Sequence, residues 1–183
     1  MSSKYKDELG LIVMKNCENF GKSIDSKIME KRQVSESFII PIEQVRFNNG
    51  EGKVVIKDSV RDKDLYILSD VGNHSETYKM FGYENHMSPD DHYQDIKRVI
   101  SAIRGQADRI SVVMPLLYES RQHRRKGRES LDCALALQEL QSLGVSTIVT
   151  FDVHDPNIQN AVPNSMSFEN FYPTNTILKE FIK

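Results

Sequence analysis

The stretch RISVVMPLLYESRQHRRKGRE, residues 109–129, decides the fold because it joins a buried strand to a charged loop. Its first part, Ile110 to Leu117, is an apolar run rich in β-branched residues. This pattern is typical of a strand with protein on both faces of a parallel sheet. The basic cluster that follows holds five cations within eight positions: Arg121, Arg124, Arg125, Lys126 and Arg128. Open α/β sheets bind ligands at the carboxyl ends of their strands, so the cluster lies where a ligand is expected.

The chemistry of this cluster favours a ligand that carries phosphates. Arginine presents a planar fork of donors that matches phosphate oxygens, so a polyphosphate suits the loop. A solvated basic turn is the alternative, and most runs of charge are of that kind. The cluster alone leaves both interpretations open.

Composition and charge narrow the class of protein. The chain has 183 residues, which suits one domain with a sizeable core. A net charge of −2 gives no general attraction to nucleic acid. No apolar run approaches the length of a membrane span, and the start, MSSKYKDELG, has no apolar signal core. Cys17 and Cys133 lie far apart, so we expect a cytoplasmic protein whose cysteines are small buried hydrophobes.

Strands and helices alternate along the chain, and this predicts an α/β fold with a mainly parallel sheet flanked by helices. The expected strands or apolar runs cover residues 9–14, 37–42, 64–69, 110–117 and 145–151. The expected helices cover the residues after the first strand and then 88–105, 130–143 and 174–182, with a helical turn at 157–161. The first helix is expected to bury Phe20, Ile24 and Ile28 on one face.

Two of the helices carry clear boundary or packing signals. Before the second helix, Ser88 is an N-cap, and Pro89 with two aspartates follows it. Its core-facing stripe consists of Ile96, Val99, Ile100 and Ile103, and Gly105 ends the helix. The third helix is expected to bury Cys133, Ala136, Leu137, Leu140 and Leu143, with Gly144 stopping it.

Residues 46–87 contain the least regular part of the chain. Asn49-Gly50 is a turn signal before KVVIKD, residues 53–58, and predicts an antiparallel flap beside the sheet. Residues 71–87 are polar without periodicity, so a loop or a short helical excursion is expected. Their histidines, with His92, would be either a metal cluster or scattered surface residues. Ligand spacing on one element is absent, which favours the second interpretation.

The segment YESRQHRRKGRESLDCALALQELQSLGVSTIVTFDVHDPNIQ resembles the ribose-phosphate pyrophosphokinase family, the phosphoribosyl diphosphate synthetases. That family carries a Tyr-x-x-Arg-Gln-Asp-Arg-Arg segment, a helix, and an Asp-Leu-His strand end that leads into Gln-Ile-Gln. The matching residues here are Tyr118, Arg121, Gln122, Arg124, Arg125, Asp152, His154, Ile158 and Gln159. A third match, RFNNGE at residues 46–51, lies upstream. Three ordered motifs over most of the chain make the resemblance specific.

The resemblance implies a phosphoribosyltransferase-like domain that uses ATP as substrate, Mg²⁺ as cofactor and ribose 5-phosphate as acceptor. Arg121, Gln122 and Arg124 would lie at the ATP site, with Arg121 on the phosphates. His154 would help hold the ATP-bound magnesium, and Asp152 stands just before it. A lone histidine at a strand end is more often structural, and Mg²⁺ prefers oxygen ligands.

The upstream match implies a site shared between subunits. Phe47, Asn49 and Glu51 would receive adenine from a neighbouring subunit, so the resemblance implies a homo-oligomer. A phenylalanine face stacks on a purine, and a carboxylate accepts from its exocyclic amine. The alternative is a hairpin turn whose phenylalanine packs in the core.

The chain also departs from the family pattern. His123 stands where the family usually has an aspartate, and Asp155, either a hard metal ligand or a turn former, stands where a small residue is usual. Residues 71–87 are longer than expected. The acidic, Gly/Thr-rich phosphoribosyl loop of the family's second half is not found.

We therefore interpret residues 1–183 as a single α/β domain that resembles the amino-terminal half of a two-domain synthetase. The family's carboxyl-terminal half is absent from this stretch, so we expect no catalytic residue within it and no activity of the stretch alone. The alternative is a non-catalytic, synthetase-like protein that binds nucleotide or regulates a partner, which His123 and residues 71–87 favour slightly.

Overall fold

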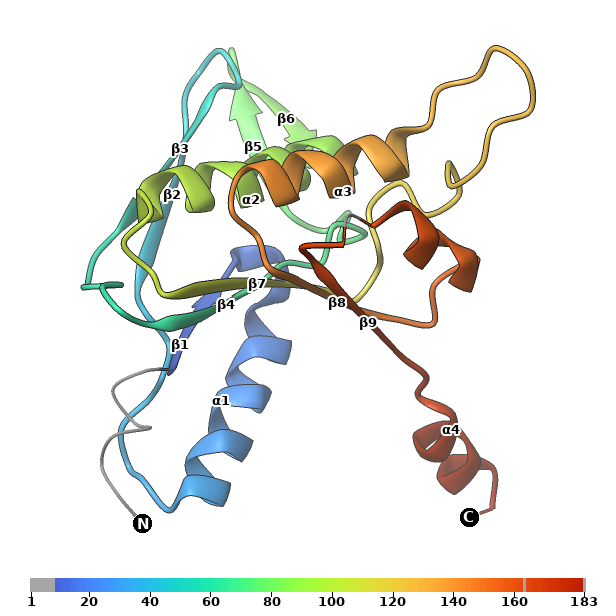
Figure 1. The fold of residues 1–183 in the computed structure, drawn as a ribbon. Helices are drawn as coiled ribbons and strands as arrows, with labels where there is room; N and C mark the ends of the chain where they lie inside the picture. Colours follow the sequence, from blue (N-terminus) through green and yellow to red (C-terminus); the bar gives the residue numbers. More distant parts are fainter. Residues whose placement is uncertain (1–8, 163, 183) are drawn as a thin grey trace.

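A five-stranded parallel sheet forms the centre of the computed structural model, which describes residues 9–162 and 164–182 (Figure 1). In spatial order its strands are β1 (Leu9–Val13), β4 (Asp64–Leu68), β7 (Arg109–Met114), β8 (Thr147–Phe151) and β9 (Ser167–Phe171). Helices lie on both faces, so the predicted fold class is confirmed. Most of the amino-terminal stretch expected to lack a signal core lies outside the described residues.

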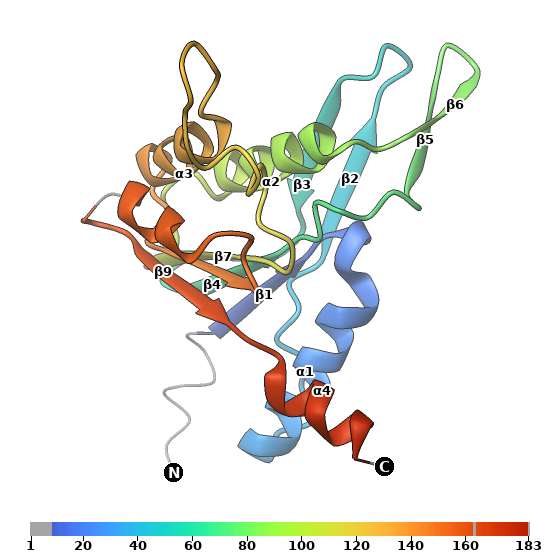
Figure 2. The ribbon, with the colours of Figure 1, turned by 90° about the vertical axis from the view of Figure 1, so that its right-hand side faces the viewer.

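The chain reverses its direction across the sheet after β1. It passes through the short 3₁₀ helix η2 (Lys15–Cys17) and α1 (Glu18–Arg32) on one face, then returns at Ile39, which pairs in parallel with Leu11. The later strands are added on the other side of β1, and their connecting helices α2 (Pro89–Ile103) and α3 (Asp132–Ser142) cover the opposite face (Figures 1 and 2). Such a reversal leaves a crevice at the carboxyl ends of β1 and β4.

The face under α2 and α3 holds the main core. Helix α2 begins with a capping box, in which Ser88 Oγ accepts from the Asp91 backbone and the Asp91 carboxylate accepts from the Ser88 backbone. Its predicted stripe is buried, and the helix ends at Ile103 with Arg104 as its C-cap before Gly105. On α3 four of the five predicted core residues are buried, whereas Leu143 is exposed. The prediction for Leu143 was wrong because α3 ends at Ser142, one residue earlier.

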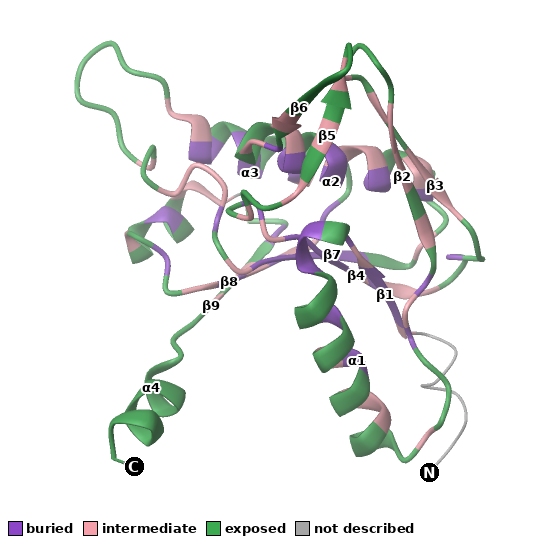
Figure 3. Cartoon of the chain, turned by 180° about the vertical axis from the view of Figure 1, so that it is seen from behind, coloured by how far each residue is buried: buried purple, intermediate pink, exposed green. Residues whose placement is uncertain are grey.

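The opposite face is covered less completely (Figure 3). Ile24 and Ile28 of α1 are half-buried against the sheet, but Phe20 is exposed, so the predicted core stripe of α1 is only partly formed. Helix α1 packs tightly against β1 at Gly21. A Cβ at this position would lie 2.3 Å from Val13 Cγ1, so a larger residue would not fit. The predicted terminal helix, α4 (Thr174–Phe181), is present and buries none of its residues.

Two antiparallel hairpins stand beside the sheet. The predicted flap is confirmed as β2 (Ile42–Arg46) and β3 (Gly52–Ile56), and its first strand begins after Pro41. The prediction for residues 71–87 was wrong: they contain a second hairpin, β5 (Thr77–Met80) and β6 (Tyr83–His86). Side chains from distant parts of the chain hold this hairpin, so local periodicity does not indicate it.

The histidines of this region do not form one cluster. The rings of His74 and His86 stack with centroids 4.4 Å apart, whereas His92 is buried with Nε2 2.7 Å from the Asn73 carbonyl oxygen. In residues 9–162 and 164–182, no group of three or more histidine, cysteine or acidic side chains is arranged to hold a metal ion. His92 is therefore a core residue rather than a surface one.

The remaining elements complete the sheet edge. Strand β9, which the sequence did not indicate, alternates exposed and half-buried residues beside β8. The predicted helical turn is the 3₁₀ helix η3 (Pro156–Ala161). None of the helices in the described part of the chain is long and apolar enough to cross a membrane.

Candidate functional site

The sheet brings two of the predicted motifs together at its carboxyl edge. Strands β7 and β8 are parallel neighbours, with Met114 opposite Thr150. The loop after β7, residues 115–131, and the loop after β8, residues 152–155, therefore start side by side. The first carries Arg121 and Gln122, and the second carries Asp152 and His154.

His123 links these two loops. Its side chain is 9% exposed, with Nδ1 3.1 Å from the Ser120 carbonyl oxygen and Nε2 2.8 Å from Asp155 Oδ2. His123 Nε2 lies within ion-pair distance of the Asp155 carboxylate, but the two groups are not aligned for a hydrogen bond. A protonated His123 would therefore attract Asp155 by charge. The ring also meets His154 edge-on, with centroids 5.5 Å apart. The residue that departs from the family pattern thus makes the contact between the loops.

Asp155 caps η3. Its Oδ1 accepts a hydrogen bond from the Asn157 backbone at 2.9 Å, and that bond, helped by the charges of His123 and Arg124, lowers the pKa of the Asp155 carboxyl. The carboxylate is therefore directed at η3 and His123. Of its two expected roles, the structure supports the turn former rather than the metal ligand.

The cations of the basic loop take part in no ion pair within residues 9–162 and 164–182. Arg121, Arg124 and Arg125 are exposed, as are Lys126 and Arg128. Unneutralised cations at a strand end make a region of positive potential that attracts an anionic ligand.

Tyr118 fixes the start of the basic loop. Its ring stacks on Tyr93 with centroids 4.3 Å apart and planes 5° apart, and its hydroxyl donates to Asp90 Oδ1 at 2.8 Å. Burial and the Asp90 carboxylate raise the pKa of Tyr118 well above its ordinary value, so the hydroxyl stays protonated as a donor. The loop therefore leaves the core from a fixed point on α2.

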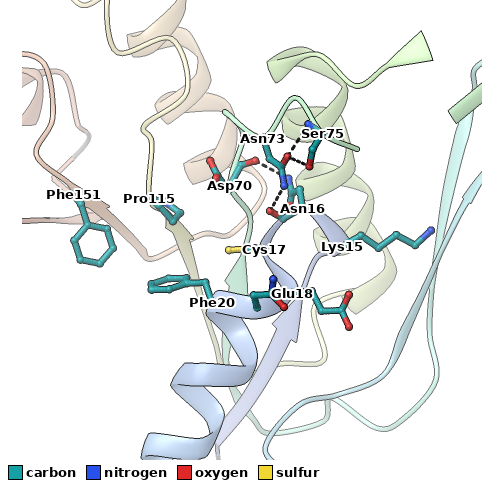
Figure 4. Close-up of a pocket in the computed structure, with 11 residues that line it drawn as sticks. Lys15, Asn16, Cys17, Glu18, Phe20, Asp70, Asn73, Ser75, Pro115 and Phe151 are labelled. Carbon is teal, nitrogen blue, oxygen red and sulfur yellow. Dashed lines mark hydrogen bonds between the residues drawn. The ribbon is translucent and has the colours of Figure 1, made fainter. Parts of the chain in front are cut away.

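The crevice between β1 and β4 adjoins this site, and Pro115 lies at its border (Figure 4). Asn16 closes its floor by donating from Nδ2 to Ser69 Oγ and to the Asp70 carbonyl oxygen, each at 3.0 Å. Burial, with the nearby Asp70 charge, raises the pKa of the Cys17 thiol to about 11, so this thiol is not a nucleophile at neutral pH. The expectation that the cysteines are small buried residues is confirmed.

Sequence reasoning missed Asn16 and Asp70. The available signal was position: Asn16 lies three residues after β1 and Asp70 two residues after β4, and the carboxyl ends of these strands meet the same edge of the sheet.

The flap loop, residues 47–51 between β2 and β3, presents its three predicted residues to solvent. Phe47 is 47% exposed, so the alternative in which this phenylalanine packs in the core is wrong. Asn49 donates from Nδ2 to Glu51 Oε2 at 2.8 Å and accepts from the Glu51 backbone at 3.1 Å. In Figures 1 and 2 the flap tip and the basic loop lie well apart. Within one chain the structure does not bring these three residues to Arg121.

Asp152 and His154 are exposed at the end of β8. Asp152 adopts a left-handed backbone conformation with φ 47°, and its N–H donates to the Phe171 carbonyl oxygen at 2.9 Å. One carboxylate and one imidazole are too few for a resident magnesium held by protein alone. Mg²⁺ prefers oxygen ligands and keeps several waters, so these two groups could supply only part of its coordination.

Comparison with known proteins identifies the family of this chain. The family model for the N-terminal domain of ribose phosphate pyrophosphokinase matches residues 9–144. The chain belongs to this family.

Similar curated proteins include ribose-phosphate pyrophosphokinase B of Dictyostelium discoideum, 29% identical over 140 residues that cover 75% of this chain and 38% of that protein. Ribose-phosphate pyrophosphokinase 1 of Schizosaccharomyces pombe is 34% identical over 116 residues, 62% of this chain and 25% of that protein. The chain thus spans well under half the length of these pyrophosphokinases.

A crystal structure of phosphoribosylpyrophosphate synthetase from Mycobacterium smegmatis superimposes with a TM-score of 0.72, covering 96% of this chain and 51% of that one. At 21% identity this likeness supports the fold alone. The family membership itself rests on the match at residues 9–144.

Proposed function

We propose that this chain is the ATP-binding half of a ribose-phosphate pyrophosphokinase, which transfers diphosphate from Mg-ATP to ribose 5-phosphate and releases AMP. The observation that carries the proposal is the pairing of two loops at one sheet edge. Arg121 and Gln122 follow β7, His154 follows β8, and His123 joins the loops through Asp155 at 2.8 Å. A nucleotide with several phosphates fits this arrangement of free cations and exposed polar groups.

The cations of the basic loop act on the phosphates. Arg121 and Arg124 are exposed and have no ion-pair partner in residues 9–162 and 164–182, so a polyphosphate meets charges that need no prior bond to break. The Gln122 amide can both donate and accept, which suits nucleotide edges or ribose hydroxyls. Neutralising the phosphates and positioning the β-phosphorus would supply most of the catalysis.

The flap loop serves the adenine of a neighbouring subunit. The exposed face of Phe47 stacks on the purine, and Glu51 accepts from its exocyclic amine, with Asn49 orienting that carboxylate. The distance of this loop from the basic loop of its own chain supports a shared site. The protein then works as a homo-oligomer, and light scattering that finds only monomer at high concentration would contradict this.

Magnesium enters with the nucleotide. His154 and Asp152 would hold it from the protein side, and the ion would neutralise phosphate charge. A site for the acceptor, ribose 5-phosphate, is not found in the same way. Residues 1–183 contain no acidic, Gly/Thr-rich turn that could bind its 5-phosphate. We therefore expect this stretch alone to bind Mg-ATP without transferring diphosphate.

The test is Arg121→Ala. We expect it to weaken Mg-ATP binding by about 1.5–3 kcal/mol, the range for a hydrogen bond to a charged group, measured by isothermal titration calorimetry. Arg128→Ala is the matched control, because Arg128 is also an exposed cation of the loop but lies outside the matching motif. Unchanged affinity in Arg121→Ala would contradict the assignment.

A second candidate is a non-catalytic relative that binds nucleotide or regulates a partner. The observation in its favour is His123, an imidazole in a position where the family usually has an aspartate. AMP release by the full-length protein, with and without ribose 5-phosphate, separates the two. Release that depends on ribose 5-phosphate supports the enzyme, and its absence supports the relative.

A further inference from the structure

The second hairpin contacts the flap through its turn and through two side chains of β5. In Figures 1 and 2 the β5–β6 and β2–β3 hairpins stand side by side with their tips at the same end. At the tips the Phe81 backbone N–H donates to the Asn48 carbonyl oxygen at 2.9 Å. This bond ties the turn of one hairpin directly to the loop that carries Phe47, Asn49 and Glu51.

Side chains on the inner face of β5 fill the space behind the loop. Gly50 has φ 89°, and a Cβ built there would lie 3.1 Å from the Met80 sulfur. The Tyr78 ring lies under the Arg46 guanidinium, with the central carbon 5.0 Å from the ring centroid. Thr77 and Lys79 point the other way and are exposed. The contacts with the flap loop therefore come from alternate residues of one strand.

Arg46 connects the hairpin, the loop and α2. Its guanidinium donates to the Gly50 carbonyl oxygen at 3.2 Å and pairs with the buried Asp95 carboxylate at 3.0 Å. It also donates weakly to the Met87 sulfur at 3.9 Å. A cation with these partners on three elements keeps the base of the loop in one position relative to α2.

The hairpin is itself anchored at its base. The Met87 backbone donates to the Glu76 carbonyl oxygen at 2.9 Å, and His86 Nδ1 lies 2.8 Å from the His74 carbonyl oxygen. His92 of α2 reaches the Asn73 carbonyl oxygen just before the hairpin. The hairpin thus has fixed ends and can act as a support rather than as a loose loop.

We propose that the β5–β6 hairpin holds the loop at residues 47–51 in its ligand-facing shape, with Met80, Tyr78 and Arg46 as positioning residues that act through the loop. A loop that is already ordered loses less conformational entropy when the ligand binds, and this raises affinity without a new contact. That the ligand is adenine rests on the proposed function. That the hairpin holds residues 47–51 in place does not depend on it.

Amide hydrogen exchange tests the positioning. In the double variant Tyr78→Ser/Met80→Ser, we expect the Phe47 and Gly50 amides, which donate within the loop, to exchange at least about 10-fold faster. Amides of β4 and β7 should keep their rates. Thr77→Ser/Lys79→Ser is the matched control on the outer face, and Tyr78→Phe/Met80→Leu should restore the slow exchange. Unchanged rates at residues 47–51 in the serine variant would overturn the inference.

Nucleotide kinetics of the full-length protein separate this inference from the proposed function. If both hold, the serine variant raises KM for ATP about 10-fold with kcat unchanged, and the conservative variant does not. If exchange accelerates while KM for ATP stays the same, the hairpin positions the loop and the adenine assignment of the loop fails.

Discussion

The flap loop and the basic loop carry the two motifs assigned to the nucleotide, yet the structure holds them in opposite ways. The flap loop is supported by the half-buried Arg46 guanidinium, the buried Asp95 carboxylate and a second hairpin. The basic loop is exposed from Arg124 to Ser130, with Tyr118 fixing its start and His123 attaching its middle. The flap loop is therefore held in one conformation by the protein, whereas the basic loop exposes its charges and has few supporting contacts.

The difference suits the two parts of a nucleotide. Stacking on a purine needs a face at a defined place, because van der Waals attraction falls off within an ångström of contact. Attraction between cations and phosphates acts over about 10 Å in dilute salt, so it tolerates a loop that orders only around its ligand. Three substitutions, from the largest expected effect on stability to the smallest, test this contrast.

Arg46→Ala should cause the largest loss of stability among the three substitutions. It removes one partner of the buried Asp95 and the support of the flap loop, and we expect the free energy of unfolding to fall by about 3 kcal/mol. The value stays at the lower end of the range for a broken buried pair because Arg98 still pairs with Asp95. Urea denaturation measures it.

The control for this change is Arg109→Ala, which breaks the exposed pair with Asp64. Exposed ion pairs contribute less than about 1 kcal/mol, so a small loss is expected there. An equal loss in both variants would show that the flap network is no stronger than a surface pair.

Tyr118→Phe should have an intermediate effect. It keeps the stacking on Tyr93 but removes the hydroxyl bond to Asp90, and we expect a loss of about 1 kcal/mol in thermal or urea unfolding. Tyr172→Phe is the comparison, since Tyr172 is exposed and donates no hydrogen bond in the described structure. If both tyrosines give the same small change, the hydroxyl bond to Asp90 does not help to anchor the start of the basic loop.

Arg125→Ala should have the smallest effect. The side chain is exposed among like charges, so stability should change by less than about 0.5 kcal/mol, with a slight gain at low salt as repulsion decreases. Urea denaturation at two salt concentrations detects this. A loss above about 1 kcal/mol would mean that the loop is packed rather than open, and the contrast with the flap would fail.

Much of the architecture was predictable from local pattern. The stripe of Ile96, Val99, Ile100 and Ile103 and the Ser88 cap predicted α2, and the capping box with buried isoleucines confirms it. Short apolar runs predicted β4, β7 and β8 in the same way. These signals work because burial of one face repeats with the period of the element that carries it.

For the candidate site, the sequence predicted where single residues lie along the strands but not which of them contact each other. The sequence indicated Arg121, Gln122 and His154 at strand ends, but not that His123 would meet Asp155, 32 positions further along. It likewise indicated the flap, but not the hairpin behind it. Thr77 to His86 are mostly polar, and their strands depend on partners such as Arg46 and Gly50 that lie far away in the chain.

The sequence by itself determined most strands and helices of the main sheet, the core face of α2 and the positions of the charged loops, because each depends on neighbours within a few residues. Only the tertiary structure decided that the chain reverses after β1, that two loops meet through His123, and that Arg46 joins a hairpin to a helix. Those features depend on contacts between distant segments, and such contacts form only when the core has brought the segments together.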